Sequence, residues 1–384
     1  MNNFVFDDRA QQVMQKIHQA GFDAWFVGGC VRDALIAKSF GDYDIATSAY
    51  PEDIKSLLNH EFELDFKGAK FGCVRVLNND LWLEVTTLRE DTQTDGRHAK
   101  VTFTKDLAKD AARRDFTINA LYWHGAPHAP SEIVDFYGGQ EDLAKGRVQF
   151  IGNPDLRVEE DYLRILRFFR FSANYALDLD ESGLNACTDH QGGLQYLSGE
   201  RVWCEWSKTL FGKNTLAVLE AINAQSIDMT LFGGKINTRI YNEYQGYDPL
   251  LVTSLLLPTV RSEHLAHRLN LSNAQKDWLK IAIALGSDCD FRMQYVEHGQ
   301  RARELVYFWA CTYQKNSDEI FTQDFWNTKT PVFPLGGKDI INLGCQPGPI
   351  VGKYLERARQ WWAQNNFKPS YRDCLEYAQS LFNK

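Results

Sequence analysis

The stretch FVGGCVRDALIAKSFGDYDIAT, residues 26–47, places two adjacent glycines after an apolar run and two aspartates shortly afterwards. The apolar run predicts a buried strand, and the residues after the glycines predict a short helix. Gly28 and Gly29 carry no side chains, so their backbone N–H groups can approach a phosphate group, which Arg32 could also reach. The same glycines also suit a tight strand-to-helix turn, and this segment alone does not separate the two interpretations.

Asp42 and Asp44 lie two residues apart within the predicted strand DYDIAT. Residues at i and i+2 of a strand point to the same face, so both carboxylates would meet at one site. Two like charges this close repel each other unless a cation lies between them, and Mg²⁺ prefers oxygen ligands. In a chain with 50 acidic residues a lone Asp-x-Asp pair also arises by chance, so on its own it is weak evidence of a metal site.

A third carboxylate belongs to the strand pattern LWLEVTTL, residues 81–88. The alternation of apolar and polar residues places Glu84 on the more polar face of this strand. On a strand next to Asp42 and Asp44, it would complete a group of three carboxylates, which is typical of two-metal sites for attack on a phosphoryl group. The alternative interpretation of Glu84 is a solvated strand residue.

The pattern of predicted elements changes near residue 140. Before this point, runs such as FGCVRVL (71–77) predict strands between helical segments such as PEDIKSLLN (51–59). After it, EEDYLRILRFFRFSANY (159–175) and KYLERARQWWAQ (353–364) carry apolar residues at helical spacing. We therefore predict an α+β fold, with an N-terminal head of mixed sheet and helices followed by an all-helical remainder.

Composition and charge narrow the class of protein. The 384 residues carry a formal net charge of −8, which argues against a protein that binds nucleic acid non-specifically. Local clusters of basic residues can still contact a nucleic acid. No apolar run is long enough to cross a membrane, and the first residues do not resemble a signal peptide. The eight cysteines are scattered without a zinc or disulfide pattern, so we expect reduced thiols in a cytoplasmic protein.

Five sequence blocks follow one another in order between about residues 26 and 205. They are GGCVRD with DYDIAT, RRDFTINALYW, DFYGGQEDL, EEDYLRILRFFRF and ERVWCEWSKTL. In this order they resemble the class II CCA-adding tRNA nucleotidyltransferases and bacterial poly(A) polymerases, a family of the polymerase-beta nucleotidyltransferase superfamily. Five ordered blocks are far more specific than any one of them.

The resemblance implies roles for the residues that match the family blocks. Asp42 and Asp44 would bind Mg²⁺ and carry out catalysis, with Glu84 in support. The residues implied to bind the incoming nucleotide are Gly28, Gly29, Arg32, Asp33, Arg114, Asp115, Asn119, Asp161, Arg164, Arg167 and Arg170.

In RRDFTINALYW, Asp115 and Asn119 are four residues apart, and we expect them to share a helix face. The resemblance places Arg114 on phosphate and Asp115 with Asn119 near the ribose. The ribose 2′-OH is both a donor and an acceptor, which such a pair could read. Without the other blocks, the same residues would be read as a helix cap and a salt bridge.

In EEDYLRILRFFRF, we expect Asp161 and Arg164 to share a helix face that Arg167 and Arg170 continue. The resemblance implies that Asp161 and Arg164 read the Watson–Crick edge of the base, while the other two arginines reach the triphosphate. Adenine and cytosine each present an amino donor beside a ring-nitrogen acceptor, which suits a carboxylate and a guanidinium. The alternative is an amphipathic helix with a solvated basic face.

The function that the resemblance implies is template-independent addition of C, C and A to tRNA 3′ ends from CTP and ATP, with release of pyrophosphate. TDGRHAKVTF (94–103) resembles the flexible loop of CCA-adding relatives, and we expect a mobile loop there. A poly(A) polymerase of the same family is the main alternative, although the chain lacks the strongly basic C-terminus of those relatives. An enzyme that adds only CC or only A is a further alternative. The loop argues against a CC-adding enzyme, and nothing in the sequence decides against an A-adding one.

The resemblance also implies a division of the chain. We expect a catalytic head at 1–138, a helical neck at 139–205, a helical body at 206–300 and a helical, tRNA-binding tail at 301–384. Partners would be the tRNA 3′ end, CTP and ATP, without a membrane, and the oligomeric state is not indicated. A non-catalytic RNA-binding protein on the same scaffold would have lost a metal carboxylate, and a small-molecule nucleotidyltransferase would lack the Asp161/Arg164 block.

Overall fold

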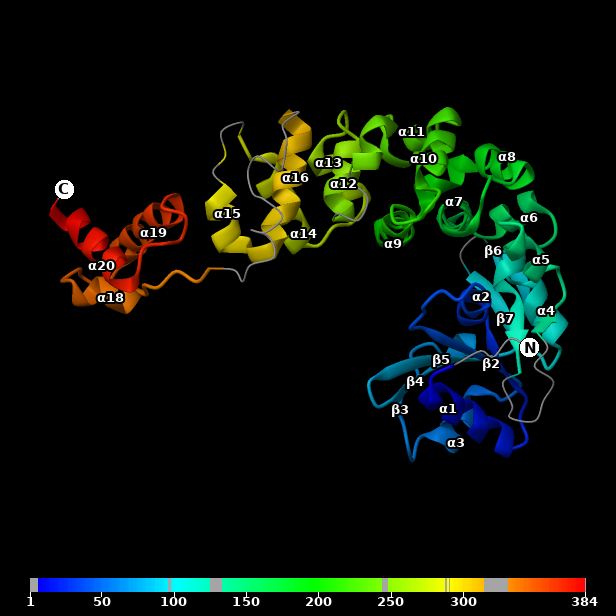
Figure 1. Ribbon diagram of the computed structural model, residues 1–384. Coiled ribbons are helices and arrows are strands. Elements are labelled where there is room, and N and C mark those ends of the chain that lie inside the picture. Colours follow the sequence, from blue (N-terminus) through cyan, green and yellow to red (C-terminus); the bar gives the residue numbers. More distant parts are fainter. Residues whose placement is uncertain are drawn as a thin grey trace. The chain divides into compact units, whose positions relative to one another are not determined.

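Figure 1 shows a computed structural model of the chain, which describes residues 6–95, 98–124, 133–243, 248–286, 289, 291–313 and 331–383. By its internal contacts the chain forms two compact units. The first contains Met1–Ile236 and His267–Asn270, and the second contains Asn237–Ala266 and Leu271–Lys384. The finer division into head, neck, body and tail stays a prediction.

Within the described residues, the head of the first unit is built on a seven-stranded mixed sheet in the order β3-β4-β5-β2-β1-β8-β9. The strands are β1 (Ala24–Val27), β2 (Tyr43–Thr47), β3 (Glu63–Asp65), β4 (Cys73–Asn78), β5 (Leu81–Thr87), β8 (Leu121–Trp123) and β9 (Ile133–Asp135). Neighbouring strands are antiparallel except β2 and β5, which run parallel. The strands predicted at β1, β2, β4 and β5 are confirmed, whereas the short strands β3, β8 and β9 were not predicted.

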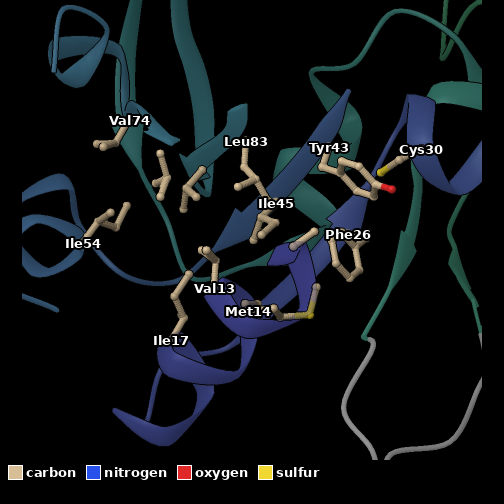
Figure 2. Close-up of a cluster of buried hydrophobic side chains, with 14 of the residues drawn as sticks. Val13, Met14, Ile17, Phe26, Cys30, Tyr43, Ile45, Ile54, Val74 and Leu83 are labelled. Atoms are coloured by element: carbon tan, nitrogen blue, oxygen red, sulfur yellow. The ribbon is translucent and has the colours of Figure 1, made fainter. Parts of the chain in front are cut away.

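One face of the sheet forms the main core of the head. The helices that pack on it are α1 (Asp8–Gln19) and α3 (Pro51–Leu58). Figure 2 shows Val74 and Leu83 of the sheet together with Ile17 of α1 and Ile54 of α3 in this layer, and all four are buried. Burying such an aliphatic side chain contributes about 1.5–3 kcal/mol, so this layer holds the sheet and both helices together.

The opposite face of the sheet is covered over one half only. Val27 of β1 and Ala46 of β2 are buried there in a second cluster, to which α4 (Leu107–Ala112) contributes. Over β4 and β5, by contrast, Arg75 and Trp82 are exposed on this face. The sheet therefore has an open half next to the end of β2 that carries Asp44.

Residues 94–103, where we expected a mobile loop, belong in their described part to two antiparallel strands, so the prediction of a loop in place of strands was wrong, while its mobility stays a prediction. The strands are β6 (Arg89–Asp95) and β7 (His98–Phe103). The consecutive residues Val101, Thr102 and Phe103 favour extended backbone, and an Asp-Gly pair is also the preferred turn of a hairpin. Gly96 itself lies outside the described residues.

The segment that carries Asp115 and Asn119 is not an α-helix, contrary to our expectation. Helix α4 ends at Ala112, Phe116 is extended, and Thr117–Asn119 form a single 3-10 turn, η2. The ring of Phe116 is buried among other aromatic rings, and its backbone pairs with Phe150 in an isolated β-bridge. This tertiary packing outweighs the helical preference of the local sequence.

The remaining helices of the first unit include the predicted neck. They are α2 (Gly29–Leu35), α5 (Gly139–Ala144), α6 (Pro154–Glu160), α7 (Leu163–Tyr175), α8 (Glu181–Asp189), α9 (Gly199–Thr209), α10 (Thr215–Ala224) and α11 (Ile227–Phe232). The single helix expected over 159–175 is broken at Asp161, whose backbone is extended (φ −157°, ψ 108°). The Asp161 carboxylate accepts a hydrogen bond from the backbone N–H of Leu163 at 3.0 Å, so the N–H group of the first residue of α7 has a partner.

The second unit is helical throughout its described residues. Its helices, of which α13 ends within the segment assigned to the first unit, are α12 (Pro249–Leu256), α13 (Ser262–Arg268), α14 (Asn273–Ile283), α15 (Phe291–His298), α16 (Ala302–Tyr313), α18 (Gly337–Asn342), α19 (Pro349–Gln364) and α20 (Tyr371–Ser380). Trp362 is buried in the core of the last three helices, while Trp361 stacks on Tyr377 with ring centroids 4.4 Å apart. The predicted α+β head with a helical remainder is thus confirmed. None of the described helices has the length and apolar character needed to cross a membrane.

Candidate active site

A cavity of about 580 Å³ lies in the first unit beside the turn between β1 and α2. Its lining residues are Gly28, Gly29, Arg32, Asp33, Phe40, Gly41, Asp42, Asp44, Arg114, Asp115, Asn119, Arg167, Arg170, Phe171, Asn174, Tyr175, Lys208 and Phe211. Most residues that the sequence assigned to the site therefore meet in one place. Glu84, Asp161 and Arg164 do not line this cavity.

The glycine turn at the cavity has a geometry that requires a glycine. Gly28 has φ 71°, and a Cβ at this position would lie 3.4 Å from Nη1 of Arg114. Its N–H donates to the carbonyl oxygen of Leu121 at 3.0 Å, which ties the turn to β8. The turn thus brings bare backbone to the cavity wall, although the N–H of Gly28 is already occupied.

Asp42 and Asp44 reach the cavity from the start of β2, where Asp42 is exposed and Asp44 partly buried. Glu84 lies beside Asp44, because β2 and β5 run parallel with these two residues in register. Burial raises the pKa of Asp44 to about 6, with a further contribution from the negative charge of Glu84. An uncompensated carboxylate of this kind favours a bound cation.

The donor set of this corner fits a divalent cation. No hydrogen bond within the described part of the chain reaches the carboxylate of Asp42 or of Asp44, so their oxygens are available as ligands. Carboxylate oxygens are the ligands that Mg²⁺ prefers. The predicted group of three ligands is not assembled: among the described residues, no three His, Cys, Asp or Glu side chains are arranged to hold a metal ion. The geometry therefore supports a two-carboxylate site with Glu84 as a neighbour.

Arg32 and Asp33 form a buried network in the cavity wall. The Arg32 guanidinium donates to the Asp33 carboxylate at 2.9 and 3.1 Å, to Oδ1 of Asn119 at 2.6 Å and to the hydroxyl of Tyr175 at 2.8 Å. Tyr175 in turn donates to Asp33 at 2.8 Å, and burial raises the pKa of its hydroxyl to about 12. We expected Arg32 to reach a phosphate, but here its guanidinium joins α2 to η2 and α7.

Arg114 is held by Asp110, a residue that our sequence analysis missed. The Asp110 carboxylate accepts hydrogen bonds from Arg113 at 2.7 and 2.9 Å, from Arg114 at 3.2 and 3.3 Å and from the hydroxyl of Tyr122 at 2.8 Å. Burial raises the pKa of Asp110, but the two guanidinium groups outweigh it and lower this pKa to about 2. The i+3 and i+4 spacing of the arginines from Asp110 is a local signal that would have predicted the contact.

Asp115 links η2 to α7 at the back of the cavity. Its carboxylate accepts a hydrogen bond from Nδ2 of Asn119 at 3.0 Å and one from Nε of Arg167 at 2.6 Å. Burial raises the pKa of Asp115, but Arg167 and the hydrogen bonds outweigh it and lower this pKa. Glu205 of α9 lies 3.7 Å from Arg167 and 3.1 Å from Arg170.

Asp161 and Arg164, the predicted base-reading pair, are engaged elsewhere. The Asp161 carboxylate lies 2.7 Å from Nη2 of Arg201. Arg164 forms an ion pair with Glu160 and donates to the backbone carbonyl of Arg157 at 2.9 Å. The expected shared helix face does not exist, because Asp161 precedes α7 in extended conformation.

Seven residues of the cavity were not predicted, namely Phe40, Gly41, Phe171, Asn174, Tyr175, Lys208 and Phe211. Three of them, Phe171, Asn174 and Tyr175, follow Arg167 at helical spacing on α7, so periodicity would have placed them on its face. The Phe171 ring lies 4.3 Å from the guanidinium carbon of Arg170, a distance typical of a cation–π contact. Lys208 comes from α9, and no local signal links it to the site.

Comparison with known proteins gives a family for this geometry. Residues 24–149 match the family described as the poly A polymerase head domain. The chain is 31% identical to the CCA tRNA nucleotidyltransferase 1, mitochondrial, of Danio rerio, over 97% of this chain and 90% of that protein. It is 40% identical to the CCA-adding enzyme of Leuconostoc mesenteroides, over 91% of this chain and 90% of that protein.

Solved structures share the fold over nearly the whole chain. The CCA-adding enzyme of Bacillus stearothermophilus in complex with CTP superposes with a TM-score of 0.75 at 24% identity, covering 98% of this chain and 97% of that one. The CCA-adding enzyme of Thermotoga maritima complexed with tRNA gives a TM-score of 0.63 at 20% identity, covering 99% and 97%. At these identities the likeness establishes the fold.

Proposed function

The chain belongs to the family of CCA-adding tRNA nucleotidyltransferases, and from this premise we propose how its residues carry out the reaction. The enzyme adds C, C and A to the 3′ end of tRNA from CTP and ATP and releases pyrophosphate. The observation that supports our assignment of the site is the convergence of the glycine turn, the carboxylates of Asp42 and Asp44 and the guanidinium groups of Arg114, Arg167 and Arg170 on one cavity.

We assign Mg²⁺ binding to Asp42 and Asp44. Their carboxylate oxygens accept no other hydrogen bond among the described residues, and a cation removes their mutual repulsion. When bound, the metal supplies Lewis acidity, which favours ionisation of the tRNA 3′-OH and offsets the charge that develops on the α-phosphate. Glu84, in register with Asp44, adds negative potential that strengthens cation binding.

We assign the triphosphate to Arg114, Arg167 and Arg170, which present guanidinium groups to the cavity from two elements. Asp110 and Glu205 hold these groups in place before a nucleotide enters, which lowers the entropic cost of binding. The pair Asp115 and Asn119 holds the ribose. Phosphate binds bidentately to guanidinium groups, so the arrangement suits three linked phosphates better than a single one.

We assign the choice of base to Asp161 and Arg164. A carboxylate and a guanidinium can pair with both cytosine and adenine, whereas guanine and uracil present the opposite order and leave a buried charge unpaired. Because each residue is bound elsewhere in this structure, base reading requires that Asp161 leave Arg201 and that Arg164 leave Glu160. One pocket then accepts CTP and ATP without a nucleic-acid template.

The test of this function uses the purified protein, Mg²⁺ and a tRNA transcript that ends at its discriminator base. Each NTP is offered singly, then CTP with ATP, and the 3′ ends are sequenced. We expect two cytidines with CTP alone and one further adenosine when ATP is added. Long adenosine runs would identify a poly(A) polymerase, products that stop at CC would identify a CC-adding enzyme, and addition of A only to a transcript ending in CC would identify an A-adding enzyme.

We further propose that the enzyme works in the cytoplasm and that its predicted tail, residues 301–384, contacts tRNA. Seven described cysteines are unpaired, which suits a reducing compartment. Lys353 and Arg357 of α19 are exposed and can reach a phosphate backbone. Cell fractionation tests the compartment, and loss of tRNA affinity in Lys353→Ala/Arg357→Ala with unchanged CTP affinity tests the tail.

A further inference from the structure

The open half of the sheet carries a row of charged residues that the assignments above use only in part. Four charged residues follow one another across the strands, each in register with the next. They are Asp44 of β2, Glu84 of β5, Arg75 of β4 and Asp65 of β3. The walls of the nucleotide cavity come from α2, η2 and α7, on the β1 side of β2. Asp44 therefore stands at the border between this cavity and the open face of β5 and β4.

Arg75 and Trp82 form a cation–aromatic pair on this open face. The guanidinium carbon of Arg75 lies 4.7 Å from the centroid of the Trp82 ring, and Trp82 precedes Glu84 by two residues on the same face. The Trp82 side chain is 37% exposed and Arg75 is exposed as well. Arg75 has no ion pair among the described residues. The carboxylate of Asp65, its register partner, accepts a hydrogen bond from the backbone N–H of Lys67 at 3.0 Å and lies 3.7 Å from Nζ of Lys67.

Such a pair has the chemistry of a binding site for single-stranded RNA. An exposed indole offers a face on which a base can stack, and a guanidinium beside it offers donors for the adjacent phosphate. In a protein with a net charge of −8, next to the carboxylates of Glu84 and Asp44, an unpaired cation also offsets the repulsion of an approaching phosphate backbone.

We propose that Trp82 and Arg75 bind the last nucleotides of the RNA strand that is being extended. This inference rests on the proposed function of the cavity. In-line attack requires that the 3′-OH approach the α-phosphate from the side opposite the departing pyrophosphate. With the triphosphate on the β1 side of Asp44, the RNA strand end lies on the β5 side, over Trp82 and Arg75.

Steady-state kinetics with a small hairpin RNA that ends at the discriminator base test this site. Trp82→Ala and Arg75→Ala should each raise the KM for RNA about 10-fold, which corresponds to about 1.4 kcal/mol, with the KM for CTP changed less than about twofold. Trp82→Phe keeps an aromatic face and should recover most of the RNA affinity. A purely structural role of Trp82 would not separate the two KM values in this way.

A matched control is available on the other side of the same sheet. Lys55 of α3 lies 5.3 Å from the ring of Phe66, so it forms a similar cation–aromatic pair on the face that is covered by helices. Lys55→Ala should leave the KM for RNA unchanged. A rise of the same size in Lys55→Ala and Arg75→Ala would show a general charge effect and overturn the proposal.

A second measurement keeps the test valid if a variant does not fold. A hairpin RNA with 4-thiouridine as its last or penultimate nucleotide is irradiated with the wild-type enzyme, and crosslinked peptides are mapped. We expect crosslinks within β4 and β5, residues 73–87. Crosslinks confined to other peptides, or a rise in the KM for CTP alone, would overturn the proposal, whereas failure of the wild type to add C, C and A would instead overturn the proposed function.

Discussion

The Asp44 carboxylate is partly buried, and none of the described residues compensates its negative charge with a hydrogen bond. Burial and the neighbouring Glu84 raise its pKa to about 6 from the ordinary 3.8. At neutral pH Asp44 is ionised in both the native and the unfolded chain. Ionising it costs more free energy in the native protein, because its pKa is higher there. Asp44 thus lowers the stability of the metal-free protein, and in our proposal it provides a ligand for the metal.

Asp44→Asn should lower the rate of nucleotide addition by at least about 100-fold, while the affinity for tRNA stays nearly unchanged. In metal-free buffer the variant should be more stable than the wild type by about 1–2 kcal/mol, because the cost of ionising a buried carboxyl is removed. MgCl₂ should raise the Tm of the wild type but not of the variant. Asp178→Asn, an exposed aspartate, serves as the control, and equal loss of tRNA binding and activity in Asp44→Asn would contradict the metal role.

Asp110→Asn should lower the free energy of unfolding by about 2–3 kcal/mol at pH 7, because Arg113 and Arg114 lose their buried counter-charge. The native pKa of Asp110, about 2, lies below its ordinary value of 3.8, so the unfolded chain takes up this proton first as the pH falls. The stabilisation is complete above pH 3.8 and is lost as the pH falls toward 2.

Urea denaturation of Asp110→Asn at pH 7 and in steps down to pH 3 measures this dependence. The difference between wild type and variant should be constant above about pH 5 and shrink below pH 4. Glu220→Gln, an exposed acid on α10, should show no such change. A difference that stays constant down to pH 3 would contradict the pairing of Asp110 with the arginines.

Arg164→Ala should relax the choice of base. We expect the ratio of kcat/KM for CTP over UTP to fall about 10- to 100-fold, because UTP no longer leaves a guanidinium unpaired. Arg147→Ala provides a control, since Arg147 pairs with Asp142 at 2.7 Å and does not line the cavity. An unchanged preference in a variant with wild-type Tm would remove Arg164 from base recognition.

At the scale of elements, the site depends on the packing of α7 against its neighbours. Helix α7 carries Arg167 and Arg170 and packs against α9, which supplies Glu205. Just after α9, Gly212 approaches α7 closely: a Cβ there would lie 2.2 Å from the carbonyl oxygen of Ala173. The distance between these helices is therefore limited by a glycine that does not itself line the cavity.

Gly212→Ala should lower the free energy of unfolding by about 1–3 kcal/mol, because the added methyl group forces α7 and the end of α9 apart. It should also raise the KM for CTP, since the arginines on α7 move with the helix. Gly192→Ala is a matched control, because a Cβ at Gly192 has no atom within 4 Å. Thermal unfolding and kinetics measure both variants, and equal effects in the two would contradict the steric argument.

At the scale of the whole molecule, the chain does not divide into its two units at a single point. It leaves the first unit after Ile236, returns with His267–Asn270 and leaves again. Arg268 in the returning segment donates to the backbone carbonyls of Leu231, Leu197 and Leu194 at 3.0, 3.3 and 2.9 Å. The packing of the first unit therefore depends on His267–Asn270, which follow the rest of this unit in the sequence after a segment of the second unit.

Arg268→Ala should lower the stability of the first unit by about 2–3 kcal/mol, because three backbone carbonyl groups each lose a hydrogen bond. Limited proteolysis with mass spectrometry should show faster cleavage near Leu194–Leu197 in the variant. Arg261→Ala, which removes an exposed arginine of the second unit, should not change this pattern. Unchanged cleavage in Arg268→Ala would contradict the anchoring role.

The sequence by itself determined those parts of the protein that have a local period or a local steric requirement. The strand, the glycine turn and the helix at residues 26–35 were predicted because an apolar run is stabilised by burial in the core and adjacent glycines suit a tight turn. Gly28 has the positive φ that glycine adopts without strain. Asp44 lies on a strand as predicted, whereas Asp42, which was expected on the same strand, precedes its first residue, Tyr43. The Asp115–Asn119 contact was also predicted, although the helix that was expected to cause it is absent.

Only the tertiary structure decided the features that depend on contacts far apart in the chain. The burial of Phe116 replaced a helix by an extended segment, and the extended backbone at Asp161 took this residue out of the row with Arg164. The approach of Lys208 to the cavity and the return of Arg268 to the first unit likewise have no local signal. The physical reason is that local preferences amount to tenths of a kcal/mol per residue, whereas burying one aromatic ring or pairing one buried charge contributes several times more.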